Sequence, residues 1–132
     1  MQVFPRFAPQ AYALLRIVSG LLFACHGAQK LLGWPHSQMG KTPIASFMGL
    51  AGVIELVCGL MIAFGFFTGF AAFVAAGEMA VAYFKAHFPS GPIPLLNRGE
   101  LAAVYAFLFL FIATHGSGIW GVDNLMGKRA RR

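Results

Sequence analysis

Long apolar runs separated by short polar breaks dominate the chain. Four of them reach or approach the roughly 17–25 residues that a helix needs to cross a bilayer core, and they cover residues 11–32, 46–66, 69–88 and 99–114. Because a membrane-spanning segment must satisfy its own backbone hydrogen bonds, each run is expected to be a helix. The pattern predicts an all-α fold, an integral membrane four-helix transmembrane bundle, with residues 1–132 forming a single domain.

The breaks between the runs predict how the helices are joined. Only Phe67 and Thr68 separate the second run from the third, so these helices are expected to form a tight antiparallel hairpin. The connection over residues 89–98 contains three prolines, which disfavour a helix and predict an extended or turn path. The sequence His-Gly-Ser-Gly over residues 115–118 ends the fourth run, and the chain finishes in a basic tail over residues 127–132.

The composition excludes an ordinary water-soluble domain. Hydrophobic residues make up 58% of the chain and charged residues 11%, against about 45–50% and 25% in soluble domains. A net charge of +6 would favour nucleic-acid binding in a soluble protein. Here the basic residues lie at the ends of apolar runs and in the tail, where they face lipid headgroups. The lipid bilayer is therefore the expected partner, and nucleic acid is not.

The basic residues also predict an orientation. Four spans place both termini on one side of the membrane, which then carries six basic residues, whereas the other side carries four. Because cytoplasmic segments are enriched in Lys and Arg, the termini of this multi-pass protein are expected in the cytoplasm. The first run is too long for a signal peptide and is followed by no cleavage site, so it is expected to be retained.

Ionisable side chains interrupt the apolar runs. Glu55 and Glu78 lie near the middle of the second and third runs, and Arg16 and His26 lie in opposite halves of the first. A charge at this depth costs about 2.5–3.5 kcal/mol on insertion scales, so such residues face the bundle interior and mark functional sites by default. Helical spacing places Lys30 on the same stripe as Arg16 and His26. We expect these five residues to form a polar seam inside the bundle.

Each residue of the polar seam also has a structural interpretation. Arg16 is expected to pair with one of the two seam glutamates, either to lock the helices together or to hold the charge of a proton carrier. His26 has the alternative of bonding a backbone carbonyl one turn away. Lys30 and Lys85 are expected to extend their ammonium groups toward the membrane interface. The sequence leaves the structural and the functional interpretations open.

Motifs for resident cofactors or covalent catalysis are missing from the sequence. It contains no CxxC pair and no glycine-rich nucleotide-binding loop. No two histidines share a span at the same depth, so neither a metal site nor a haem site is expected. No pair of nucleophile and base stands out either, and the sequence therefore assigns no catalytic residues.

Four blocks of sequence are distinctive in their order and spacing over residues 14–125. The first block, in residues 15–34, is an Arg followed by His-Gly-Ala-Gln-Lys, and the second is Glu-Leu-Val-Cys-Gly-Leu from Glu55 with Phe-Gly-Phe-Phe-Thr over residues 64–68. The third is Met-Ala-Val-Ala from Met79 with His-Phe-Pro-Ser-Gly from His87. The fourth is Gly-Glu at residues 99–100 with a later Gly-Ser-Gly and Asp123. Together these blocks resemble the DoxX family of small bacterial inner-membrane proteins.

The resemblance implies a four-helix bundle in the bacterial inner membrane and, loosely, a link to respiratory or thiol redox chemistry. With the polar seam, it leads to the hypothesis of a redox-associated subunit that binds quinone or another lipophilic ligand. Such a subunit would act with partner membrane or periplasmic proteins, as a non-catalytic part of a membrane oxidoreductase. The candidate ligand-binding or proton-relay residues are Arg16, His26, Lys30, Glu55, Glu78, His87 and Glu100. The alternatives are a structural or assembly protein without chemistry of its own, and a small proton-coupled carrier that works as a homo-oligomer.

Overall fold

The computed structural model describes residues 3–36 and 41–130, and the regular elements in this part of the chain are all helical. The long helices are α1 (Ala8–Leu32), α2 (Phe47–Phe64), α3 (Thr68–Ala82) and α5 (Glu100–His115). Shorter elements are η1 (Pro5–Phe7), η2 (Tyr83–His87), η3 (Phe88–Ser90), α4 (Pro94–Asn97) and α6 (Val122–Ala130). The predicted all-α class is confirmed.

Within the described residues, three helical segments are long and apolar enough to cross a membrane. They are Pro5–Leu32, Phe47–Phe64 and Thr68–Ser90, so the short elements η1, η2 and η3 extend α1 and α3 at their ends. The remaining long helix, α5, has 16 residues, slightly fewer than the roughly 17–25 of a typical span. The structure thus supports the first three predicted spans, and the fourth stays a prediction.

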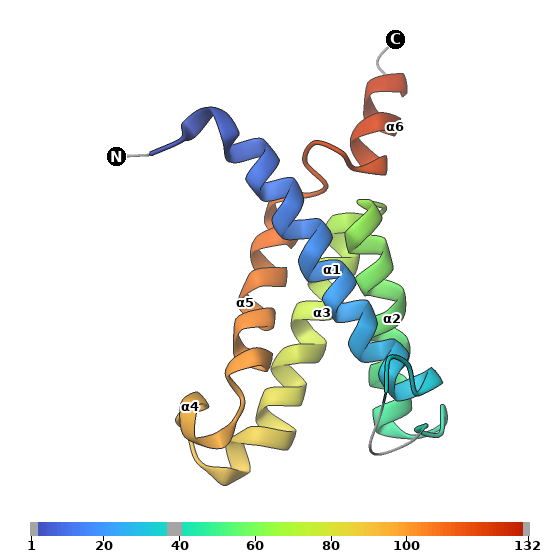
Figure 1. Cartoon of the computed structure of the whole chain (residues 1–132), viewed down its shortest axis with the longest axis vertical. Coiled ribbons are helices and arrows are strands. Elements are labelled where there is room, and N and C mark those ends of the chain that lie inside the picture. The colour runs from blue at the N-terminus through green and yellow to red at the C-terminus, as the bar shows by residue number, and fades with distance from the viewer. Residues whose placement is uncertain (1–2, 37–40, 131–132) are drawn as a thin grey trace.

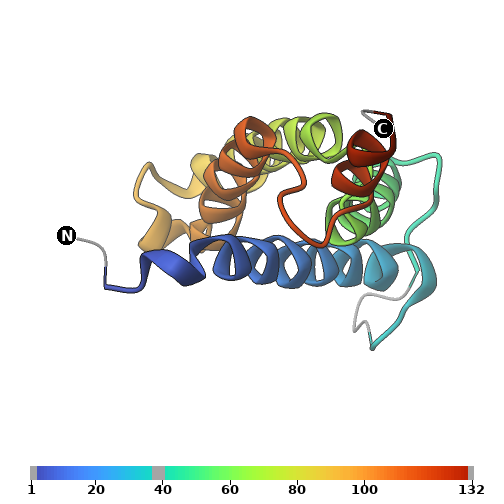
Figure 2. The same ribbon diagram turned by 90° about the horizontal axis from the view of Figure 1, so that it is seen from above.

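The helices pack as two pairs. Helix α1 packs mainly on α2, and α3 packs mainly on α5 (Figure 1). Figure 2 shows α1 lying along one side of the molecule, with α3 and α5 on the other. The two termini lie at one end of the molecule, which we call the terminal end, and α4 lies at the opposite end, which we call the loop end.

Local signals set the ends of α1 and α2. Helix α1 begins three residues before the predicted run, with Pro9 in its first turn, where a missing N–H costs nothing. It ends at Gly33, whose φ of 73° is left-handed. Helix α2 begins after Ser46, whose Oγ accepts a hydrogen bond from the N–H of Gly49 at 3.0 Å, and ends at Gly65 with a φ of 72°.

Short helical elements occur outside the long helices. The segment over residues 89–98, predicted as an extended or turn path, includes part of η3 and the single turn α4. Pro94 occupies the first turn of α4, a position that proline tolerates well, so three prolines do not exclude a helix here. Part of the tail over residues 122–130 folds as α6, which the sequence analysis did not predict.

Helices α1 and α2 approach closely through glycines. A Cβ atom added to Gly27 would lie 2.3 Å from the backbone nitrogen of Leu56, and one added to Gly59 would lie 2.5 Å from that of Ala24. Small residues allow such close contact between membrane helices, because the backbones meet without intervening side chains. This contact sets the height and the distance at which other side chains of α1 and α2 meet.

Candidate functional site

A pocket of about 290 Å³ lies between α1, α2, α3 and α5 toward the loop end. We call it the polar pocket, and it is lined by Phe23, His26, Lys30, Phe47, Met48, Ala51, Glu55, Glu78, Met79, Ala82, Lys85, Ala86, His87, Arg98, Leu101, Ala102 and Tyr105. Its volume is near the lower end of the roughly 300–1,000 Å³ of ligand pockets, and its mixed lining resembles theirs. It has room for a ring-sized head group rather than for a large ligand.

An ion pair between α1 and α2 forms one wall of the polar pocket. The Nζ atom of Lys30 donates to Oε1 of Glu55 at 2.5 Å, and the Glu55 residue is only 2% exposed. The expectation that Lys30 extends toward the interface is therefore wrong. The reason is that an uncompensated buried carboxylate is costly, and Lys30 is the cation that the helix crossing brings within its reach.

Two buried carboxylate oxygens in the polar pocket lack a hydrogen bond. Within the described residues, Oε2 of Glu55 and Oε2 of Glu78 have no partner, although both atoms are buried. Buried polar atoms in proteins are normally bonded, because leaving one unpaired costs the full desolvation penalty. Since both residues line the polar pocket, each offers an acceptor to a ligand that carries N–H or O–H donors.

Aromatic side chains form the apolar floor of the polar pocket. The ring of Tyr105 is 5% exposed and stacks on Phe109 at 5.2 Å, while the edge-on ring of His26 lies 6.3 Å from it. The backbone hydrogen bond considered for His26 is not found among the described residues, and His26 lines the polar pocket. Tyr105 was not among the candidates from the sequence, where its phenol stands out within an otherwise apolar run.

Basic residues surround the polar pocket at the loop end. His87, Lys85 and Arg98 line it there. Nδ1 of His87 lies 3.1 Å from the carbonyl oxygen of Asn97, whose buried amide donates to the carbonyl of Gly91 at 2.7 Å. This bonding holds η2 against the end of α4, so that His87 and Arg98 line the same pocket. His87 was a candidate from the sequence, whereas Lys85 and Arg98 were not.

Arg16 lies outside the polar pocket, and its expected pairing with a seam glutamate is wrong. It is fully buried, and its Nη1 donates to the carbonyls of Ile62 at 2.6 Å and Ala63 at 2.7 Å, while Nη2 donates to that of Trp120 at 3.1 Å. The last carbonyls of a helix have no partner within it and carry partial negative charge, so they attract a cation. Ile62 follows Glu55 by about 10 Å of helical rise, which separates Arg16 from the acids.

Asp123 fastens the tail to the hairpin between α2 and α3. Its Oδ1 accepts from the N–H of Phe67 at 2.8 Å, and its Oδ2 accepts from the N–H and the hydroxyl of Thr68, both at 2.9 Å. Asp123 thereby caps the start of α3, and its own N–H donates to the carbonyl of Gly65 at 2.9 Å. The sequence singled out Asp123 only as part of the fourth block, and it assigned no role to this residue.

Glu100 also lies outside the polar pocket. It is the exposed first residue of α5, where a carboxylate is favoured by the positive end of the helix dipole. Five of the seven candidates therefore line the polar pocket, and Arg16 and Glu100 do not. In residues 3–36 and 41–130, no three His, Cys, Asp or Glu side chains lie close enough to hold a metal ion.

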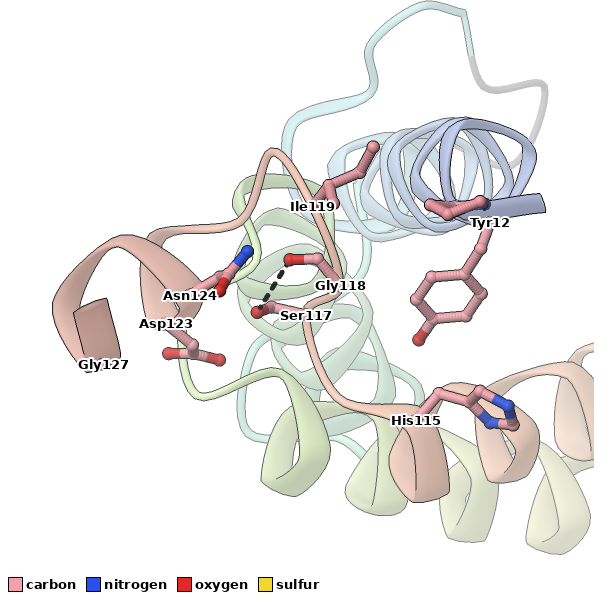
Figure 3. Close-up of a pocket in the computed structure, with 9 residues that line it drawn as sticks. Tyr12, His115, Ser117, Gly118, Ile119, Asp123, Asn124 and Gly127 are labelled. Atoms are coloured by element: carbon pink, nitrogen blue, oxygen red, sulfur yellow. Dashed lines mark hydrogen bonds between the residues drawn. The ribbon is translucent and has the colours of Figure 1, made fainter. Parts of the chain in front are cut away.

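A second hollow, of about 600 Å³, lies at the terminal end between the start of α1 and the tail (Figure 3). Tyr12, His115 and Asp123 line it, among others. The hydroxyl of Tyr12 donates to the carbonyl of Gly116 at 2.6 Å, and Asp123 is engaged in capping α3. Because these groups join α1 and the tail to the rest of the fold, this hollow is a less favourable ligand site than the polar pocket.

The chain matches a known protein family. The model of the DoxX family matches residues 11–88, which is more than half of the chain. The chain belongs to the DoxX family. The matched segment includes the five candidate residues that line the polar pocket, whereas Arg98 and Tyr105 follow it.

Two bacterial proteins resemble the chain over most of its length. An uncharacterized protein of Haemophilus influenzae is 37% identical over 129 residues, covering 94% of this chain and 96% of that protein. An uncharacterized membrane protein of Mycobacterium tuberculosis is 28% identical over 142 residues, covering 92% of this chain and 85% of that protein. No solved structure matches the chain. With its apolar helices, the chain is a membrane protein of the DoxX family.

Proposed function

We propose that this DoxX-family protein is a redox-associated membrane subunit that binds the head group of a quinone or quinol in the polar pocket. The observation that carries the proposal is the pair of buried, unbonded oxygens on Glu55 and Glu78 beside an apolar floor. A quinol has an apolar ring with a hydroxyl donor at each end, which matches acceptors in an apolar slot. The volume of about 290 Å³ suits such a ring.

The polar pocket can also handle the protons of a quinol. Oxidation of a quinol to a quinone releases two protons and two electrons. The carboxylates of Glu55 and Glu78 are placed to accept the protons, and His87 with Arg98 lines the route toward the loop end. The electrons must pass to a redox centre on a partner protein, since the sequence of this chain has no motif for an electron-carrying cofactor. The chain then supplies the ligand site, and the partner supplies the electron acceptor.

The proposal includes a placement in the bacterial inner membrane. We take α5 as a fourth span: its 16 residues rise about 24 Å, and local thinning of the roughly 30 Å hydrocarbon core accommodates the difference. An even number of spans agrees with the two termini lying at the same end (Figure 1). With the termini in the cytoplasm, the polar pocket lies in the half of the bilayer nearer the periplasm.

An assembly role is the second candidate. The Lys30–Glu55 pair joins α1 to α2, and Arg16 with Asp123 joins the tail to the hairpin, so the polar side chains also hold the fold together. In that case the polar pocket would bind no ligand, and the loop end would serve only to contact other proteins. The two functions differ in whether the purified protein carries a ligand.

The test is to purify the protein in native-lipid discs, extract it with solvent and quantify quinone by chromatography. Glu78→Gln and His26→Ala alter the polar pocket while leaving the Lys30–Glu55 pair in place, and Glu100→Gln is the matched control outside it. We expect stoichiometric quinone in the wild type and in the control, and its loss in the two pocket variants. Quinone no higher than in empty discs would refute the proposal and favour the assembly role.

A further inference from the structure

A third hollow, again of about 290 Å³, lies between α2 and α3 on the outer side of Glu78. We call it the α2–α3 hollow, and it is lined by Phe47, Leu50, Ala51, Ile54, Phe73, Val74, Gly77, Glu78 and Val81. Apart from Glu78, every residue of this lining is apolar or glycine. Phe47, Ala51 and Glu78 also line the polar pocket, so the two spaces are neighbours that share these side chains.

The shape of the helix pairs explains why this space exists. Helices α2 and α3 are joined by a tight turn at the terminal end and lie apart toward the loop end (Figure 1). Helix α2 packs more extensively on α1 than on α3, and α3 packs more extensively on α5 than on α2. Small residues keep the gap open, because a Cβ atom added to Gly77 would meet nothing within 4 Å.

A weak contact closes the α2–α3 hollow at the loop end. The Nζ atom of Lys85, in η2, lies 3.9 Å from the centre of the Phe47 ring, at the start of α2. This cation–π contact links η2, which continues α3, to the start of α2 at the loop end. Such a contact contributes little at exposed sites, and the Phe47 residue is 52% exposed. The contact can therefore open without unfolding either helix.

We propose that the α2–α3 hollow is a lateral portal through which an amphiphilic ligand enters the polar pocket from the bilayer. The inference rests on the proposed function and deepens it, because it specifies a ligand with an apolar chain. The polar head lies beside Glu55 and Glu78, and the chain leaves between α2 and α3 into lipid. The lining supports this path, since apart from Glu78 it is apolar and accommodates methylene groups.

The lipid side of the portal is built from exposed apolar residues. Phe73 is 65% exposed and Val81 is 48% exposed, so both lie where acyl chains surround the protein. A ligand chain that passes between α2 and α3 at this point moves from one apolar environment to another, so its transfer out of the bilayer costs little. The head group alone requires the polar pocket, and the chain requires only the portal.

The test fills the portal without touching the polar pocket. Val81→Trp places a large ring in the α2–α3 hollow, and Val57→Trp is the matched control, since Val57 lies on α2 outside the hollow and is 49% exposed. Two probes are compared in lipid discs: a benzoquinol without a side chain, and the same head group bearing a long isoprenoid chain. Their binding is measured with the wild type and with both variants.

We expect Val81→Trp to weaken binding of the long-chain probe by about tenfold or more, because the indole ring blocks the path between α2 and α3 that the chain needs while the head group is in the polar pocket. The short probe should keep its affinity within about twofold, and Val57→Trp should change neither probe by more than that. If Val81→Trp weakens both probes equally, Leu50→Trp fills the hollow from the opposite wall. If Leu50→Trp weakens binding of the long-chain probe alone, the portal is supported. If this second variant also weakens both probes equally, the portal is overturned.

The outcomes separate the portal from the proposed function. If Val81→Trp leaves the long-chain probe bound as in the wild type, the portal is wrong, but the head-group site stands. If the wild type binds neither probe, the proposed function itself fails, and the portal fails with it. Binding of the short probe to the wild type, lost in Glu78→Gln, establishes the head-group site independently of the portal.

Discussion

Replacing Arg16 with methionine removes three charge-assisted hydrogen bonds at the terminal end of the molecule. Each such bond contributes about 1.5–3 kcal/mol to stability. The carbonyl of Ile62 also accepts from the N–H of Gly65 at 3.1 Å, so we count only the bonds to Ala63 and Trp120 in full. Their loss amounts to about 3–6 kcal/mol, from which the better burial of an uncharged side chain recovers a part. We expect Arg16→Met to destabilise the protein by about 2–4 kcal/mol.

Reversible unfolding in mixed micelles, with increasing SDS and tryptophan fluorescence as the signal, measures this difference in free energy. Arg16→Lys is the charge-matched variant. A lysine ammonium cannot present the planar, forked donors that reach both α2 and the tail, so this variant should recover only part of the loss. Full recovery would mean that the positive charge matters and that the geometry of the guanidinium does not.

A double-mutant cycle tells which cation stabilises Glu55. Arg16→Met and Glu55→Gln should be additive to within about 0.5 kcal/mol, because their side chains lie far apart. Lys30→Met and Glu55→Gln should instead show a coupling of about 1–3 kcal/mol, because they form the buried pair. A coupling above about 1 kcal/mol between Arg16 and Glu55, or an Arg16→Met variant as stable as the wild type, would refute the assignment.

Two further predictions concern the hairpin and the helix crossing. Asp123→Ala removes the cap of α3 and should lower the free energy of unfolding by about 0.5–2 kcal/mol. Hydrogen exchange at the amides of Phe67 and Thr68, which bond Asp123, should become faster. Unchanged exchange at these amides would contradict the cap. Gly27→Ala should destabilise the protein by about 1–3 kcal/mol through overpacking of α1 on α2. The control Gly77→Ala should be neutral or stabilising in the same unfolding assay, since its methyl group has free space.

The length and position of the helices follow closely from the sequence alone. The apolar runs predicted the three candidate spans. Helix α1 ends at the left-handed Gly33, and α2 begins after the capping Ser46 and ends at the left-handed Gly65. These features are local, because the hydrogen bonds of a helix and its caps join residues within a few positions of each other. The same locality explains why a membrane protein of this family was recognisable before its structure was known.

The partners of the charged residues were decided only by the tertiary structure. On the same stripe of α1, Lys30 rather than Arg16 meets Glu55, because the crossing at Gly27 sets the relative height of α1 and α2. Arg16 instead bonds the end of α2. Asp123 caps a helix that begins 55 residues earlier in the chain. A hydrophobic pattern shows which side of a helix turns inward, but the height and angle at which two backbones cross depend on contacts that the pattern does not contain.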